Sequence, residues 1–177
     1  DLPAAQADSN LRVLWRPPAS TGYLGINQAH GPLGNQGVRV AMAMALNKTN
    51  LISTTYRTGD QAADQLIPPA IWGRDPTVSD YDYDPARARQ ILADAGYPNG
   101  FTTTLSYRPN VRSYLPNPAD TSNAIAADLQ AIGITVTVVE TDSTIFLRNW
   151  DDGSLDLFLL GWGADYLHPD NFFSPIL

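Results

Sequence analysis

The sequence contains no cysteine and only two histidines, His30 and His168, among its 177 residues. The lack of cysteine excludes disulfides and thiolate metal sites, and it fits, weakly, a protein built outside the cytoplasm without disulfides. A His-plus-carboxylate metal site needs three or four converging ligands. His168, near Asp165 and Asp170 in the sequence, is the one histidine that could belong to such a metal site, and we interpret these charged side chains as solvated. We therefore expect no metal and no cofactor.

Basic residues are also scarce, with 11 Lys and Arg against 18 Asp and Glu, a net charge of −7 and a pI of about 4.5. Such a surface repels phosphate backbones, so we expect no nucleic-acid partner. No apolar run approaches the roughly 20 residues that span a bilayer. No signal peptide is visible, because Asp1 opens a polar stretch.

Catalytic signatures are missing as well. There is no phosphate-cradling GxGxxG or GxxxxGK pattern, and no serine stands in a G-x-S-x-G setting. Asp80, Asp82 and Asp84 alternate, but their stretch lacks the glycine and the terminal Glu of a calcium loop. Nothing in the sequence indicates an enzyme.

What is present alternates between strand and helix patterns, which predicts an α/β fold with a sheet flanked by helices. We expect strands at 23–27, 101–107, 134–140 and 155–160, and helices at about 36–47, 85–95, 118–132 and 143–150. Residues 11–15 are a further strand candidate. The alternative is that this N-terminal segment is a frayed terminus without regular structure. Residues 57–80, rich in Pro, Gly and short polar residues, predict an extended loop.

Several residues support these boundaries. Asp84 followed by Pro85 predicts a helix start, and Asn117 and Asp142 are placed to cap the next two helices. The helix at 36–47 is apolar nearly all round, so it should be buried on more than one side. Arg39 is its lone charge, and we expect an ion pair inside the domain. Trp72, in the long loop, is interpreted as a packing anchor rather than a cleft residue.

The stretch after the last strand is the strongest candidate for a ligand site. Glycines and a proline should take the chain out of the sheet into a loop that carries one acid, Asp165, among large aromatics. The residues concerned are Gly161, Trp162, Gly163, Tyr166, Pro169 and Phe172. A carboxylate among aromatic rings at a strand end is a common setting for a ligand. The alternative remains that the aromatics close a core and that Asp165 makes a turn.

Six motifs, in register from about residue 20 to the end, resemble one family. They are YLGIN at 23–27, VRVAMAMALNK at 38–48, IPP at 67–69, YDPARARQILADAGYPNGF at 83–101, AADLQAIGI at 126–134 and GW-x-x-DY-x-x-PDNF at 161–172. Together they are similar to the periplasmic solute-binding proteins of the oligopeptide, dipeptide and nickel class, the extracellular solute-binding protein family 5.

The resemblance implies one lobe of a type II periplasmic-binding-protein fold, with a mixed sheet flanked by helices. Residues 1–22 would be the tail of the first lobe and the hinge crossing. Residues 23–177 would be the second, substrate-binding lobe, incomplete at its C-terminus. The chain would therefore be a piece of a protein roughly three times longer.

The implied function is that of the substrate-binding component of an ABC importer, which binds peptides between two lobes and delivers them to a membrane permease. Its partners would be the solute, the permease and the missing first lobe. The protein would lie in the periplasm or on the cell surface, touching the membrane only through the permease or a lipid anchor. An oligosaccharide or a metal chelate as solute, or a lobe that no longer binds, remain alternatives.

The resemblance also implies roles for individual residues. Asp165 matches the Asp that pairs with the α-ammonium of a bound peptide, and Arg112 matches an Arg that pairs with the ligand's carboxylate in dipeptide-type members. Trp162 and Gly163 would run along the peptide main chain as an added strand, with Tyr166 beside them. Leu167 and His168 depart from the usual residues, which puts the pocket for the ligand's first residue in doubt.

Overall fold

A computed structural model describes residues 2–14, 16–174 and 176, and it confirms the mixed α/β fold. The sheet has four strands in the order β1-β4-β2-β3. Strand β2 pairs in parallel with β3 and β4, whereas β1 runs antiparallel to β4. The elements are α1 (Leu2–Ala7), β1 (Ser20–Ile26), η1 (Gly31–Gly34), α2 (Gln36–Ala45), α3 (Lys48–Thr55), α4 (Pro85–Asp94), β2 (Phe101–Tyr107), α5 (Pro118–Ala131), β3 (Ile134–Glu140), α6 (Ser143–Asp151), β4 (Leu157–Gly163) and α7 (Asp170–Phe173).

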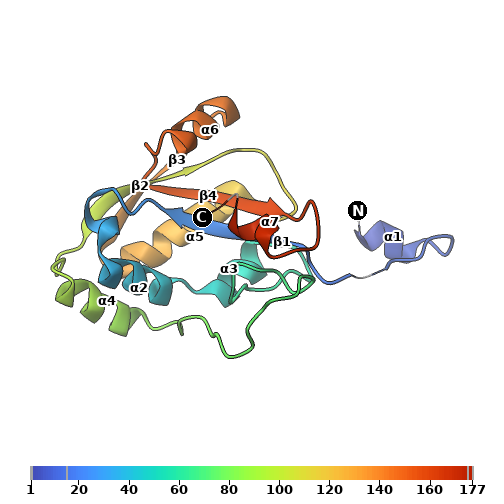
Figure 1. Cartoon of the computed structure of the whole chain (residues 1–177), viewed down its shortest axis with the longest axis horizontal. Helices are drawn as coiled ribbons and strands as arrows, with labels where there is room; N and C mark the ends of the chain where they lie inside the picture. Colours follow the sequence, from blue (N-terminus) through green and yellow to red (C-terminus); the bar gives the residue numbers. More distant parts are fainter. Residues whose placement is uncertain (1, 15, 175, 177) are drawn as a thin grey trace.

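The sheet is covered by α2, α4 and α5 on one face, as Figure 1 shows. Leu157 and Leu159 of β4 point into the main core with these helices, whereas Phe158 and Leu160 pack with Phe146 of α6 on the other face. The alternation follows from the period of two along a strand. Both faces of β4 are therefore buried, which accounts for its unbroken apolar run.

The predicted helix starts are confirmed where a side chain closes the first turn. Asp84 Oδ1 accepts a hydrogen bond from Arg87 N (2.8 Å), and Asp142 Oδ1 accepts from Thr144 N (2.9 Å). Asn117 precedes α5 as expected, but its side chain makes no capping bond and instead donates to Thr55 O (2.6 Å). Strands β2 and β3 have the predicted bounds.

The N-terminal segment differs from its prediction. Residues 11–14 form no strand, and Trp15 lies outside the described residues. Residues 2–7 form a short helix instead, on an arm that extends away from the lobe (Figure 1). Leu11 and Leu14 are exposed. A strand requires a hydrogen-bonded neighbour, and no strand of this sheet runs beside the arm.

Two further expectations in the following segment were wrong. The helix predicted to reach residue 47 ends at Ala45. A second helix, α3, which was not predicted, follows it, and Asn47 is its N-cap: Asn47 Oδ1 accepts a hydrogen bond from Asn50 N (3.0 Å). Arg39 makes no ion pair among the described residues. Its guanidinium donates instead to the carbonyl oxygens of Leu33 (3.0 Å) and Gly34 (2.9 Å), which tie η1 to α2.

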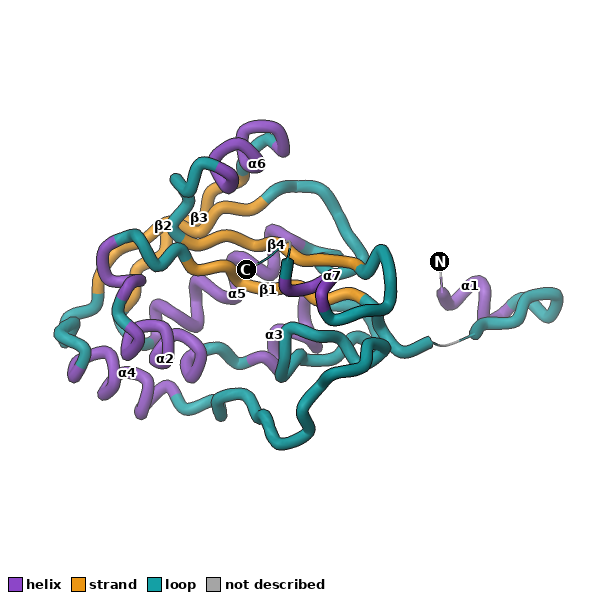
Figure 2. Tube along the Cα trace, viewed as in Figure 1, coloured by secondary structure: helices purple, strands orange, loops and turns teal. Residues whose placement is uncertain are grey.

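The long loop over 57–80 contains no helix or strand, as predicted, and Figure 2 shows it in teal between α3 and α4. Trp72 is not the packing anchor expected, since it is 64% exposed. Its ring instead makes an edge contact with His168, with ring centroids 4.9 Å apart. The anchors of this loop are Ile67 and Ile71, which pack with Phe172 in a small separate cluster.

Candidate functional site

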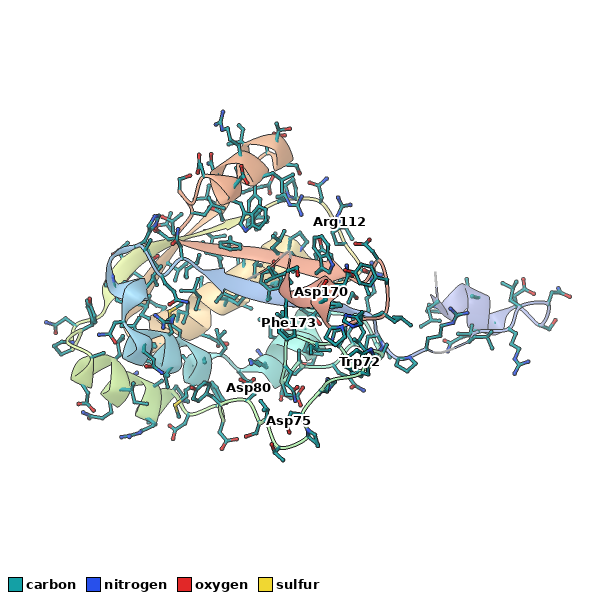
Figure 3. The ribbon with its side chains drawn as sticks, viewed as in Figure 1. Trp72, Asp75, Asp80, Arg112, Asp170 and Phe173 are labelled. Atoms are coloured by element: carbon teal, nitrogen blue, oxygen red, sulfur yellow. The ribbon has the colours of Figure 1, made fainter. Side chains whose placement is uncertain are left out.

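Two parallel strands bring the candidate residues to one edge of the sheet. Because β2 and β4 run in the same direction, the loops that follow them leave at the same edge. Arg112 lies on the first loop, and the second runs from Ala164 to Pro169 before α7. Figure 3 shows Arg112 on the same side of the molecule as Asp170 and Phe173 of α7.

Strand β4 is shifted relative to the prediction over 155–160, because it begins two residues later, at Leu157, and ends three residues later, at Gly163. It carries two of the candidate residues. The chain does not leave the sheet at Gly161, because Trp162 and Gly163 pair with Thr21 and Ser20 of β1. The predicted loop therefore begins three residues later, at Ala164. The neighbouring strand β1 supplies the hydrogen-bond partners that hold this glycine-containing segment extended.

The end of β4 presents an open main-chain edge. Ala164 N donates to Ala19 O (2.8 Å), so the pair Gly163–Ser20 next to it is a non-hydrogen-bonded pair of the antiparallel ladder. The N–H and C=O of Gly163 consequently point away from β1. On that side, the pairing between β2 and β4 stops at Phe158. Gly163 is exposed, so an extended chain can hydrogen-bond there.

Asp165 lies just beyond this edge and is exposed. Its backbone N–H donates to Asn171 Oδ1 (2.8 Å). Its carboxylate makes no hydrogen bond or ion pair with any described residue. The side chain therefore does not close the turn itself, and the carboxylate is available to a cationic group.

Arg112 is presented by a tight turn on the preceding loop. Arg112 and Leu115 exchange two backbone hydrogen bonds of 3.1 Å. Tyr114, within that turn, lies against Gly22 of β1 and Gly161 of β4, which are register partners on adjacent strands. A Cβ on Gly161 would approach the Tyr114 ring to 2.4 Å, and a Cβ on Gly22 would approach Tyr114 O to 2.4 Å. The two glycines thus leave the space that Tyr114 and its turn occupy. Arg112 is exposed, and its guanidinium makes no hydrogen bond with a described residue.

The two aromatic candidates serve the loop differently. Trp162 is half-buried against the cluster of Ile67, Ile71 and Phe172. Tyr166 is 52% exposed, and its hydroxyl donates to Asp170 Oδ2 (3.2 Å). Hydrogen bonds from Ser174 and then Tyr166 hold the pKa of Asp170 below its usual value. Phe172, expected along the loop, is fully buried in α7.

The prediction missed Asn171, which is 5% exposed and accepts hydrogen bonds from both Trp162 and Asp165. A buried amide beside a fully buried Phe is not visible as such in a sequence. It also missed the contact of Trp72 with the loop. Gly73, next to it, has a positive φ of 91°, and a Cβ there would come within 3.1 Å of Pro169.

A separate cavity of about 670 Å³ lies between β1, α2, α3 and the loop over 59–66. None of the five predicted ligand residues lines it. Its wall includes Tyr23 and Tyr56, and burial raises the pKa of each to about 12. Consecutive residues of β1 line this cavity, so the cavity lies along β1, the strand at the end of the sheet, and is separate from the main-chain edge at Gly163.

Among the residues that the structure describes, no group of three or more His, Asp or Glu side chains is placed to hold a metal ion. No helix within these residues has the length and apolar character needed to cross a bilayer.

Comparison with known proteins gives a match over the whole chain. The profile of the bacterial extracellular solute-binding proteins, family 5 Middle, matches residues 1–177. The chain is 34% identical over 177 residues to heme-binding protein A of Haemophilus influenzae, covering 100% of this chain and 32% of that protein. It is 33% identical over 176 residues to the dipeptide-binding protein of Escherichia coli, covering 99% of this chain and 33% of that protein.

A solved structure agrees with these relatives. The dipeptide binding protein from Pseudoalteromonas sp. SM9913, in complex with Met-Leu, superimposes with a TM-score of 0.89 and 30% identity. The match covers 98% of this chain and 34% of that one. The chain thus spans about a third of the length of the relatives it matches.

Proposed function

Since this chain belongs to the bacterial extracellular solute-binding protein family 5, a family of non-enzymatic transport components, we propose that it is the substrate-binding lobe of an ABC importer component and that its ligand is a peptide. The family's binding proteins are periplasmic or extracellular, and the four-stranded mixed sheet flanked by helices is the lobe of a type II periplasmic binding protein. Residues 23–177 form this lobe in the proposal, and residues 1–22 lead to a first lobe that completes the cleft. The loaded protein delivers its ligand to a membrane permease, and it touches the membrane there or through a lipid anchor.

The observation that carries the proposal is the open main-chain edge at Gly163, with a carboxylate beyond it and a guanidinium at the same edge of the sheet. An extended peptide adds to such an edge by main-chain hydrogen bonds, which leave its side chains to separate pockets. In the proposal Trp162 and Tyr166 flank the added strand. This arrangement suits a ligand that has a peptide backbone and two charged ends.

The charged ends of a peptide need partners once they leave water. An ammonium or carboxylate buried without one loses several kcal/mol of solvation, and a charge-assisted hydrogen bond offsets that loss. Asp165 takes the α-ammonium in the proposal, because its carboxylate is exposed and makes no hydrogen bond with a described residue. Arg112 takes the carboxylate at the opposite end of a short ligand.

A metal chelate is the second candidate ligand, and the 34% identity to a protein named heme-binding protein A favours it. Native mass spectrometry of the two-lobe protein separates the two candidates by the mass of the co-purified ligand. A series of masses that fit short peptides supports the first candidate, and a single porphyrin mass supports the second.

The direct test of the peptide site uses calorimetry on the two-lobe protein. Asp165→Asn should weaken the binding of peptides with a free amino terminus by about tenfold or more, because it removes a charge-assisted partner. N-acetylated peptides, which carry no ammonium, should bind both proteins alike. Asp82→Asn is the matched control, since Asp82 is an exposed carboxylate in the distant loop before α4.

Arg112→Ala tests the proposed contact of the Arg112 guanidinium with the ligand's carboxyl terminus. Short peptides with a free carboxyl terminus should lose affinity, amidated ones should not, and Arg87→Ala on the exposed face of α4 should change neither. If Asp165→Asn weakened free and acetylated peptides equally, the assignment of the ammonium to Asp165 would be wrong.

A further inference from the structure

Helix α7 is fixed to the lobe by one aromatic side chain. Phe172 is fully buried and packs with Ile67 and Ile71 of the long loop. Asn171, the residue before it, is therefore held in place and is itself 5% exposed. A buried amide must find hydrogen-bond partners, because leaving them unmade is costly.

The partners of Asn171 are two of the candidate ligand residues. Its Oδ1 accepts from the backbone N–H of Asp165 (2.8 Å) and from Nε1–H of Trp162 (3.3 Å). One donor lies at the end of β4 and the other in the loop that follows. A single oxygen thus sets the start of the loop relative to the strand.

We propose that Asn171 is the positioning residue of the ligand site: it holds the Asp165 backbone and the Trp162 ring so that the Asp165 carboxylate stays directed at the ligand's ammonium. This inference rests on the proposed function. The amide oxygen is neutral, so it accepts both donors without placing a second negative charge beside Asp165. Without this acceptor, the loop from Asp165 to Asp170 loses its link to the strand end, and Asp165 is no longer fixed relative to Gly163.

The first test needs no ligand and uses NMR to monitor the two groups that donate to Asn171, the Asp165 backbone N–H and the Trp162 indole N–H. In Asn171→Leu of this chain, the Asp165 amide should exchange with solvent at least about tenfold faster, and the Trp162 indole N–H resonance should shift, because both have lost their acceptor. Asn171→Asp retains an oxygen at the same place and should restore slow exchange. Asn149→Leu in α6 is the control, because the Asn149 side chain hydrogen-bonds to no described residue. Unchanged exchange in Asn171→Leu would overturn the proposal.

The second test asks whether Asn171 acts through Asp165, using calorimetry on the two-lobe protein. Asn171→Leu should weaken the binding of a free-amino peptide about tenfold in the wild-type background. In the Asp165→Asn background it should weaken binding less than about twofold, since the group it positions is gone. Equal losses in both backgrounds would mean that Asn171 merely stabilises the loop, and would overturn the positioning role. If Asp165→Asn alone had no effect on free-amino peptides, the proposed ammonium contact would fail, and the exchange test alone would decide the role of Asn171.

Discussion

Two glycines that face each other in the sheet decide where the Arg112 turn lies. Gly22 and Gly161 are register partners, and Tyr114 occupies the space that side chains on them would fill. Neither glycine has a positive φ, so their role is steric and not conformational. The position of a proposed ligand residue thus depends on the absence of two side chains elsewhere in the chain.

Gly161→Ala should lower the free energy of unfolding by about 1–3 kcal/mol, because its Cβ would lie 2.4 Å from the Tyr114 ring and 2.6 Å from Thr21 O, and overpacking of this kind is destabilising. Urea denaturation measures the change. The matched control is Gly163→Ala in the same strand. The nearest atom to its Cβ is Ser20 Cβ at 3.9 Å, so the effect should stay within about 0.5 kcal/mol. Equal losses for the two variants would contradict the steric explanation.

Asp170 gives the molecule a predictable sensitivity to acid. Hydrogen bonds from Ser174 Oγ (2.6 Å) and Tyr166 Oη (3.2 Å) lower the pKa of Asp170 in the folded state. The stabilisation is therefore present above the unfolded pKa of about 4 and is lost as the pH falls through the lower folded pKa. The melting temperature of wild type should exceed that of Asp170→Asn near pH 6, and the difference should shrink as the pH falls below about 4. A gap independent of pH would exclude this linkage.

At the scale of elements, α7 and the long loop stabilise each other through a cluster separate from the main core. Ile67, Ile71 and Phe172 form that cluster, with Trp162 packed at its side. The loop is also tied by an ion pair between Arg74 and Asp64 (2.5 Å), which lowers the pKa of Asp64. Because these contacts do not include the helices over the main core, the two segments form a unit that can open locally.

Phe172→Ala should therefore open α7 and its loop without unfolding the sheet. Truncating a buried Phe costs about 3–5 kcal/mol, which should exceed what holds so short a helix in place. Hydrogen exchange should show faster exchange at Phe173 and Ile71, while amides of β2 and β3 stay protected. Phe146→Ala, a cut of equal size under α6, is the comparison and should leave α7 protected. Uniform loss of protection in Phe172→Ala would show that the lobe unfolds as one unit.

At the scale of the whole molecule, the candidate residues form an open surface and not an enclosed pocket. Asp165, Tyr166 and Arg112 are all exposed, and Gly163 has one side of its backbone free of β2. Binding proteins of the two-lobe kind enclose a ligand by closing both lobes on it, so that each lobe supplies part of the contact. A single lobe keeps the entropic cost of association but loses much of the enclosure.

This chain alone should accordingly bind peptide at least about a hundredfold more weakly than the two-lobe protein does. Calorimetry with one dipeptide on both proteins measures the difference, with circular dichroism as the control that the isolated chain is folded. Comparable affinities would place the whole site on this lobe.

Much of the fold was predictable because its signals are local. Asp84 and Pro85 set the start of α4, and alternating side chains set β2 and β3, since a cap or a strand face is decided by residues a few positions apart. The order of the motifs in the sequence also predicted the family, which the match over residues 1–177 confirms. Of the candidate site, the sequence pointed to the strand end and the loop where Asp165 lies.

By itself, the sequence determined the family, the α/β class and the helix starts at Asp84 and Asp142, because neighbouring residues decide each of these. Only the tertiary structure decided that β4 continues through Trp162 and Gly163, since β1, from the other end of the chain, supplies the hydrogen bonds. Only it joined Asp165 to Asn171. The first outcome depends on residues distant in sequence, which meet only when burial of the core brings them together. In the second, the two residues are six positions apart, and the burial of Phe172 against Ile67 and Ile71 of the long loop holds Asn171 where it meets the Asp165 N–H.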